Sequence, residues 1–133
     1  MRIFRLEEAT ALLPTLRPLL EQLVHARRDF AIRLLEVDAT QRMQAESAAA
    51  GRASTLAKHA RDLQARVLAL VDEIQEHGCV VKDLDLGLVD FPALRGGQVV
   101  NLCWKMDEPA ISFWHRMDEG FAARKSISRR RPS

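Results

Sequence analysis

Residues 16–37, LRPLLEQLVHARRDFAIRLLEV, and residues 56–77, LAKHARDLQARVLALVDEIQEH, carry the pattern that decides the fold. In each stretch apolar residues recur in steps of four and three, which is the spacing of one face of an α-helix. The two apolar seams are equally long and match in antiparallel register, so they predict a helical hairpin over residues 6–77 with coiled-coil-like packing. Pro18 is expected to bend the first helix, so that a short helix before it begins at an angle.

The segment between the seams, residues 38–55, is polar and rich in alanine. Within it, Gly51 is the strongest candidate for the break, because glycine suits the position just past a helix end. Ser54 or Thr55 then caps the second helix. The first helix is therefore expected to run past its paired seam before the chain turns.

After Gly78 the pattern changes to short extended segments at residues 79–86 and 87–94, followed by an Arg-Gly-Gly turn. Two further segments, residues 98–105 and 110–115, flank the tetrapeptide MDEP and give the strongest hairpin signal. We expect a small sheet of three or four strands, which would be marginally stable unless it packs on the helices.

The MDEP turn sets the register of that hairpin. A two-residue or four-residue turn pairs Cys103 with Ser112 and Val100 with His115. His115 then lies on the apolar face that covers the helices, whereas Cys103 and Trp114 lie on the other face.

These elements predict an α+β fold, with a long antiparallel helical hairpin packed against a small antiparallel β unit. A chain of 133 residues fits one domain. We expect that domain to span residues 1–124, with the hairpin at about 6–77 and a β-rich cap at about 79–124. Residues 125–133 are expected to form a basic, flexible tail.

Composition places the chain among globular proteins, because 47% of its residues are hydrophobic and 29% are charged. No apolar run approaches the roughly 20 residues of a membrane-spanning helix, and the N-terminus has no signal-peptide pattern. We therefore expect a soluble, cytoplasmic protein. Cys79 and Cys103 lack metal-site or disulfide spacing and are expected to be buried thiols.

Charge is distributed unevenly along the chain. Residues 79–123 carry an excess of acidic side chains, whereas residues 124–133 carry only basic ones. A short basic end beside an acidic segment makes nucleic acid an unlikely partner, because nucleic-acid affinity needs several distributed Lys or Arg contacts. We expect the tail to act as a solubilising end.

Three strings carry a family resemblance: RLEEATALLPTL, GCVVKDLDLGLVDFPAL and VNLCWKMDEPAISFWHRMDEGFAAR. Over residues 4–124 the chain resembles a bacterial family catalogued as domain of unknown function 2203. The resemblance implies a helical N-terminal half and a motif-rich C-terminal half, and it implies no particular activity. The family tends to have Ser or Thr where this chain has Arg5, which cannot accept the hydrogen bond of a capping box with Glu8.

The acidic segment supplies Lys82, Asp83, Asp85 and Asp90 within a short stretch. Such carboxylates can do acid–base work or bind a hard cation, but the spacing does not match a calcium loop. Solvated or capping roles are the favoured interpretation for these acids.

Cys103 and His115 are residue types that form a nucleophile with its base, or a pair of metal ligands. The predicted register separates them, and only a bulge or a three-residue loop would unite them. His115 is more often a hydrogen-bonded core histidine than a ligand, although Asp118 lies three residues on and could orient its ring. An aromatic cluster around Trp104 and Trp114 suits a ligand pocket or a small core with a charged rim, and the core is the favoured interpretation.

The absence of glycine-rich phosphate loops and of hydrolase motifs favours a non-catalytic binding module over an enzyme. The binding site is expected on the β-rich part, and the expected partner is a small molecule or a protein. The sequence identifies no cofactor or metal.

A homodimer formed through the helices is a further possibility. The alternative function is a metal-assisted or acid–base enzyme using Asp83, Asp90, His115 and Asp118. The predicted ligand-binding residues are Lys82, Asp83, Asp90, Trp104, Glu108, Trp114, His115, Asp118 and Arg124.

Overall fold

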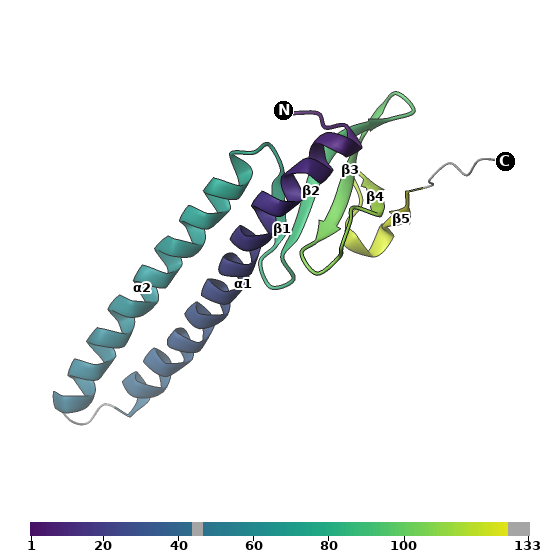
Figure 1. The fold of residues 1–133 in the computed structure, drawn as a ribbon. Coiled ribbons are helices and arrows are strands. Elements are labelled where there is room, and N and C mark those ends of the chain that lie inside the picture. The colour runs from purple at the N-terminus through teal and green to yellow at the C-terminus, as the bar shows by residue number, and fades with distance from the viewer. Residues whose placement is uncertain (44–46, 128–133) are drawn as a thin grey trace.

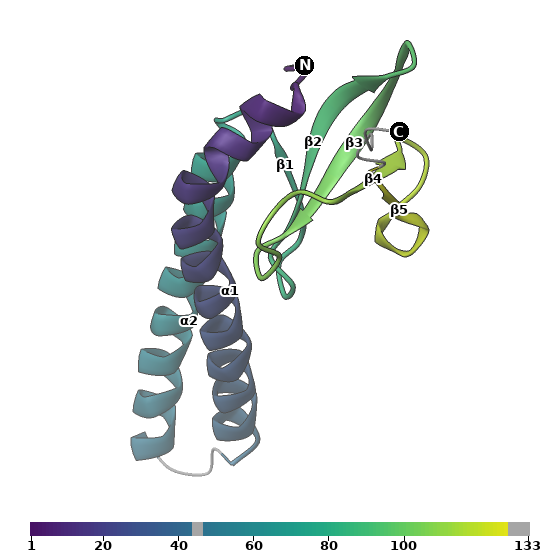
Figure 2. The same ribbon diagram turned by 45° about the vertical axis from the view of Figure 1, so that its right-hand side comes forward.

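Two long helices and a five-stranded antiparallel sheet make up the computed structural model, which describes residues 1–43 and 47–127. Helix α1 (Leu6–Arg42) and helix α2 (Ser47–Gln75) form an antiparallel hairpin, and the sheet packs beside one end of it (Figures 1 and 2). The predicted α+β class, with helices first and strands second, is confirmed.

Helix α1 is continuous through Pro14 and Pro18, so the short N-terminal segment is not a separate helix. Its first turns nevertheless lean away from the rest of the helix, as Figure 2 shows. The bend follows from the backbone hydrogen bonds that proline cannot donate. At the start of the helix, Glu8 Oε1 accepts the backbone N–H of Arg5 at 2.8 Å, and this hydrogen bond lowers the pKa of Glu8.

The turn between the helices lies earlier than predicted. Helix α1 runs past its seam to Arg42, as expected, but α2 begins at Ser47 and therefore contains Gly51, Ser54 and Thr55. The predicted break at Gly51 and the caps at Ser54 or Thr55 are wrong. One glycine costs a helix only about 1 kcal/mol relative to alanine, and the alanine-rich flanks offset that cost.

The sheet is a meander in which each strand pairs with the next one along the chain. Its strands are β1 (Val80–Asp83), β2 (Leu88–Arg95), β3 (Gln98–Lys105), β4 (Phe113–Arg116) and β5 (Lys125–Ser126). Gly96 and Gly97 both have positive φ, of 58° and 80°, which the tight turn between β2 and β3 requires. Paired structure extends past Arg124, whereas residues 128–133 of the predicted tail lie outside the described residues.

The core lies between the hairpin and one face of the sheet. Leucines of α1, among them Leu16 and Leu20, share one hydrophobic core with Phe91 and Trp104, which point from the sheet toward the helices. We call the opposite side of the sheet the open face, because the helices do not cover it. Figure 2 shows the hairpin on one side of the sheet and the C-terminal segment on the other.

The register between β3 and β4 is shifted by one residue from the prediction. Cys103 pairs with Phe113, and Asn101 pairs with His115. His115 therefore lies on the open face together with Cys103, whereas Trp114 turns toward the helices. The predicted faces of His115 and Trp114 are wrong, because a one-residue slip exchanges the two faces of a strand.

The slip has its cause in the connection between the strands, residues 106–112, which is longer than a tight turn. Arg17 of α1 donates hydrogen bonds to the backbone carbonyls of Met106 and Glu108, and Trp104 Nε1 also donates to Glu108 O at 2.9 Å. These contacts with α1 and with the Trp104 ring stabilise a connection with an odd number of residues. No local turn pattern in the sequence predicted it.

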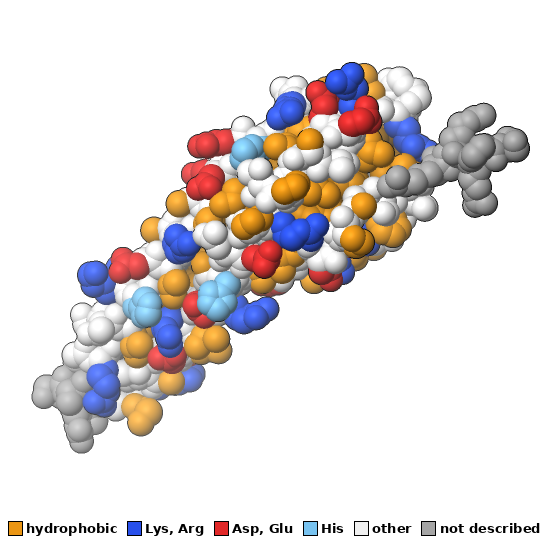
Figure 3. Space-filling view, viewed as in Figure 1, with side chains coloured by type: hydrophobic (Ala, Val, Ile, Leu, Met, Phe, Trp, Pro, Cys, Tyr) orange, Lys and Arg blue, Asp and Glu red, His pale blue; other side chains and the backbone are white. Residues whose placement is uncertain are grey.

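Hydrophobic and charged side chains are interspersed along the far half of the hairpin, which is the half away from the sheet, as Figure 3 shows. Past Ala26, no described side chain of α1 is buried, and Leu35 is 70% exposed. Among the described helices, none combines the length and the apolar character that a membrane span needs.

Candidate functional site

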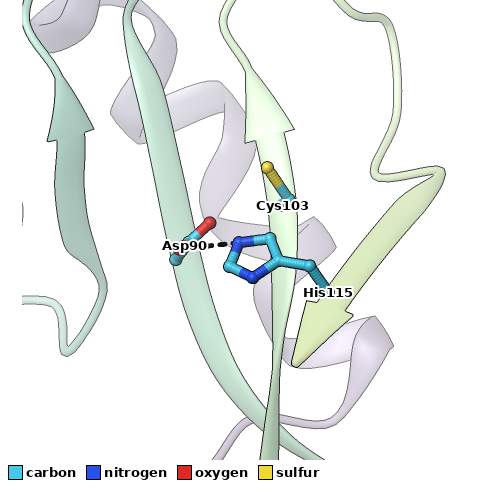
Figure 4. Close-up of side chains that lie close together, drawn as sticks. All are labelled: Asp90, Cys103 and His115. Atoms are coloured by element: carbon cyan, nitrogen blue, oxygen red, sulfur yellow. Dashed lines mark hydrogen bonds and ion pairs between the residues drawn. The ribbon is translucent and has the colours of Figure 1, made fainter. Parts of the chain in front are cut away.

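Three neighbouring strands bring an acid, a thiol and an imidazole together on the open face (Figure 4). Asp90 of β2 stands directly opposite Cys103 of β3, and His115 of β4 lies diagonally across from Cys103. Their side chains are almost completely buried, with residue exposures of 1%, 0% and 2%. Their potential metal-binding atoms all lie within 4.8 Å of one another.

Hydrogen bonds fix the orientation of the His115 ring. Nδ1 lies 2.8 Å from the carbonyl oxygen of Arg116, and Nε2 lies 3.0 Å from Asp90 Oδ2. A carbonyl oxygen only accepts, so Nδ1 carries a proton and donates it. A second proton must then lie between Nε2 and Oδ2, which makes the pair of Asp90 and His115 neutral overall whichever atom holds it.

The other carboxylate oxygen of Asp90 is unsatisfied. Oδ1 is buried and has no hydrogen-bond partner among the described residues. Burying a polar atom without a partner costs roughly 1–3 kcal/mol, so native proteins rarely do so without a reason. This oxygen marks the place where the site is incomplete.

Cys103 is held as a neutral thiol. Burial raises its pKa to about 12, and the adjacent Asp90 carboxylate adds to the rise. Both ring nitrogens of His115 already face acceptors, so the ring has no free base to take the thiol proton. The structure unites the pair that the predicted register kept apart, but it does not activate Cys103 as a nucleophile.

Above the trio lies a pocket of about 320 Å³, which we call the open-face pocket. Its lining comes from β1, β2, β4 and the loop that leads into the short helix η1 (Phe121–Ala123). The lining residues are Lys82, Asp83, Leu88, Asp90, His115, Glu119, Gly120 and Phe121. The buried members of this lining are Leu88, Asp90 and His115, and the two polar ones, Asp90 and His115, form its floor.

Arg124 ties the C-terminal segment to the open face. Its guanidinium lies 4.1 Å from the ring centres of both Phe113 and Phe121, and its Nη1 donates to both carboxylate oxygens of Glu108 at 3.1 Å. The two charged side chains are mostly buried, and their mutual pairing satisfies them there. Glu108 and Arg124, both predicted site residues, thus meet beside the pocket and do not line it.

Two acids at the rim of the pocket already have partners. Asp83 Oδ1 accepts the backbone N–H groups of Asp85 and Leu86, each at 2.8 Å, so this carboxylate caps a turn, one of the capping roles favoured from the sequence. Glu119 accepts hydrogen bonds from the Lys125 ammonium and from the Arg116 backbone, and these bonds lower its pKa. Lys82 lines the same rim and has no ion-pair partner among the described residues.

The remaining predicted residues lie away from the pocket. Trp104 is fully buried on the helix side of the sheet. Trp114 also turns to that side, where its ring lies between Arg95 and Lys125. Asp118 is exposed and does not line the pocket; among the described residues, the partners of the His115 ring are Asp90 and Arg116. Asp118 therefore does not orient that ring, contrary to the sequence-based expectation.

The predicted ligand-binding set lacks Cys103, which the predicted register separated from His115, and it lacks Leu88, Glu119, Gly120 and Phe121 of the lining. Strict alternation along β4 would have revealed the first: placing Trp114 inward puts His115 outward, beside Cys103. The lining residues gave no such signal, because a loop folding back over a sheet is a long-range contact.

Comparison with known proteins identifies the chain only at the level of its family. No curated protein and no solved structure matches it. One family model, described as "Uncharacterized conserved protein (DUF2203)", matches residues 2–127, nearly the whole chain. The chain therefore belongs to this family, as the three strings of its sequence indicated.

Proposed function

We propose that the protein is a ligand-binding module and that the open-face pocket is its binding site. One observation carries the proposal: the floor of the pocket contains a buried carboxylate oxygen, Asp90 Oδ1, which lacks a partner among the described residues. A ligand that reaches the floor supplies the missing partner. The volume of about 320 Å³ lies at the lower end of small-molecule sites, so the ligand is small.

Catalysis has less support than binding. The enzyme considered from the sequence needs Asp83, Asp90, His115 and Asp118 to act together, yet only Asp90 and His115 are in contact. Asp83 caps a turn and Asp118 lies outside the pocket lining. The neutral Asp90 and His115 pair, held by Arg116, is better suited to bind a ligand than to exchange protons with a substrate.

Filling the pocket tests the proposal. Gly120 has extended backbone angles, and a Cβ built on it meets no atom within 4 Å, so Gly120→Trp puts a bulky ring at the pocket without backbone strain. Gly51→Trp is the matched control, because a Cβ at Gly51 is equally free and Gly51 lies far along the hairpin. Both variants are expected to fold.

The measurement is a titration of isotope-labelled full-length protein with small polar fragments and with divalent metal chlorides, followed by NMR. We expect at least one of these probes to shift the amide signals of Lys82, Glu119 and Phe121 in the wild type and in Gly51→Trp. The same probe should leave Gly120→Trp unchanged. Shifts that persist undiminished in Gly120→Trp, or the absence of any shift at these residues, would overturn the proposal.

A further inference from the structure

The trio at the floor of the pocket has the composition of a metal site. Asp90, Cys103 and His115 offer one oxygen, one sulfur and one nitrogen, and they are the one such group with ligand spacing in the part of the chain that the structure describes. Each comes from a different strand of a paired sheet, so their spacing is set by rigid backbone rather than by a loop (Figure 4). Sites built on strands hold their geometry better than sites on loops.

The orientation of His115 fits the same interpretation. Metal-binding histidines characteristically donate the N–H of the other ring nitrogen to a carboxylate, a backbone carbonyl or water, which fixes the ring. Here Nδ1 donates to Arg116 O, which leaves Nε2 to face Asp90 and Cys103. A cation that replaces the proton between Nε2 and Asp90 Oδ2 needs no rotation of the ring.

A purely structural role explains the trio less well. A hydrogen-bonded core cluster satisfies its buried polar atoms, yet Asp90 Oδ1 has no partner among the described residues. An ordinary core cluster also avoids a carboxylate beside a buried thiol, since each group disfavours the ionised form of the other. A bound cation removes the second difficulty, and it removes the first as well when the Asp90 carboxylate binds it through both oxygens.

We infer that Asp90, Cys103 and His115 bind a divalent transition-metal ion of the zinc class at the floor of the open-face pocket. The inference rests on the proposed function, because it names the ligand of the same site. Thiolate, imidazole and carboxylate together suit Zn²⁺, whereas Mg²⁺ and Ca²⁺ prefer oxygen ligands alone. Binding releases the thiol proton and the proton shared by Asp90 and His115, so two negative charges balance the ion.

The geometry requires only a small closure. Tetrahedral zinc with bonds of about 2.0–2.3 Å separates its ligand atoms by about 3.3–3.8 Å. The observed atoms lie within 4.8 Å of one another, so the side chains must approach by about 1.5 Å at most. Three protein ligands leave a fourth position on the side of the pocket, which water or a small ligand occupies.

Cobalt titration tests the inference on full-length protein purified without a polyhistidine tag and stripped of metal. We expect one Co²⁺ per chain, with visible bands of tetrahedral cobalt and a near-ultraviolet thiolate-to-cobalt band, and competition by Zn²⁺. Cys103→Ser should remove the near-ultraviolet band. His115→Ala and Asp90→Asn should each weaken binding more than the roughly 10- to 100-fold that loss of an outer hydrogen-bond partner causes.

Matched controls are Cys79→Ala, which removes the other buried thiol, and His25→Ala, which removes an exposed histidine of α1. Both should bind cobalt as the wild type does. If a trio variant fails to fold, the wild type alone still decides: Zn²⁺ should slow alkylation of Cys103 by iodoacetamide and leave that of Cys79 unchanged.

The outcomes separate the two proposals. Fragments that bind the pocket of a protein that takes up neither Co²⁺ nor Zn²⁺ would overturn the metal site and leave the binding function intact. Cobalt binding that survives in Cys103→Ser and His115→Ala with undiminished affinity would also overturn it. If neither fragments nor metal bind, both proposals fall.

Discussion

At the level of single residues, the open face differs from an ordinary solvent-facing sheet surface because it buries polar and ionisable side chains. Asp90 and His115 neutralise each other, and Cys103 stays protonated because burial and the neighbouring carboxylate raise its pKa. The second cysteine, Cys79, is buried in the core and donates to Ile74 O, and burial raises its pKa to about 11. Both thiols are therefore neutral in the folded, metal-free protein at ordinary pH.

These two raised pKa values predict a loss of stability in alkali. Cys79 and Cys103 ionise near their ordinary pKa of about 9 only when the chain unfolds, so above that pH the unfolded state has released protons that the folded state keeps. Their stabilising effect is complete below about pH 9 and is lost as the pH rises toward the folded values. The free energy of unfolding should fall by about 1.4 kcal/mol per pH unit for each thiol.

Urea unfolding between about pH 8 and pH 10 measures this slope, and the chain has no tyrosine to titrate in the same range. Cys79→Ala should show about half the wild-type slope, because one thiol remains. A wild-type stability that stays flat over this range would show that the folded thiols ionise as easily as the unfolded ones.

At the level of secondary-structure elements, η1 covers part of the open face. Arg124 holds it there, because its guanidinium stacks on Phe113 of β4 and on Phe121 of η1. Arg124→Ala removes that stacking and leaves Glu108 without its ion-pair partner. We expect η1 to detach and alkylation of Cys103 in the native protein to accelerate at least about 10-fold, as expected for a local opening made easier by about 1.4 kcal/mol. Loss of the Arg124 charge opposes this effect, but burial is the larger influence on the Cys103 pKa.

Peptide mass spectrometry after timed exposure to iodoacetamide gives the rate at each cysteine separately. Cys79 lies on the other side of the sheet and serves as the internal control, with an unchanged rate. Arg116→Ala, which removes an exposed arginine of β4, should leave both rates unchanged. Equal rates at Cys103 in Arg124→Ala and in the wild type would mean that η1 is held by other contacts.

The sequence predicts the secondary-structure elements that show a clear apolar period. It does not predict features, such as strand register, that depend on contacts between residues far apart in the chain. The helical hairpin and the four longer strands follow from local patterns, because each pattern reports which face of its own element is buried. The register of β4 does not, because Arg17 of α1 shapes the preceding loop across the fold. Because of that single slip, the sequence did not predict that Cys103 and His115 lie close together and form a trio with Asp90.

At the level of the whole molecule, the hairpin divides into two halves with different surroundings. The half next to the sheet contributes Leu13, Leu16, Leu20, Leu23 and the facing residues of α2 to the core. The far half contains no buried side chain on α1 past Ala26 and none on α2 before Ala60, among the side chains that the structure describes. The pairing of the two helices and the bonds within each helix stabilise that half, rather than burial in the core.

This division predicts a gradient of protection along the hairpin. Amides of residues 27–42 and 51–59 should exchange with solvent much faster than those of residues 13–26 and 60–74, because local opening of the far half exposes little apolar surface. Native-state hydrogen exchange of the full chain, read by mass spectrometry at low and at high protein concentration, measures the gradient. Exchange that slows in residues 27–42 as the concentration rises would instead indicate that a second copy covers Ile32 and Leu35, which are 44% and 70% exposed. Uniform protection at every concentration would mean that helix pairing alone stabilises the far half as well as the core does.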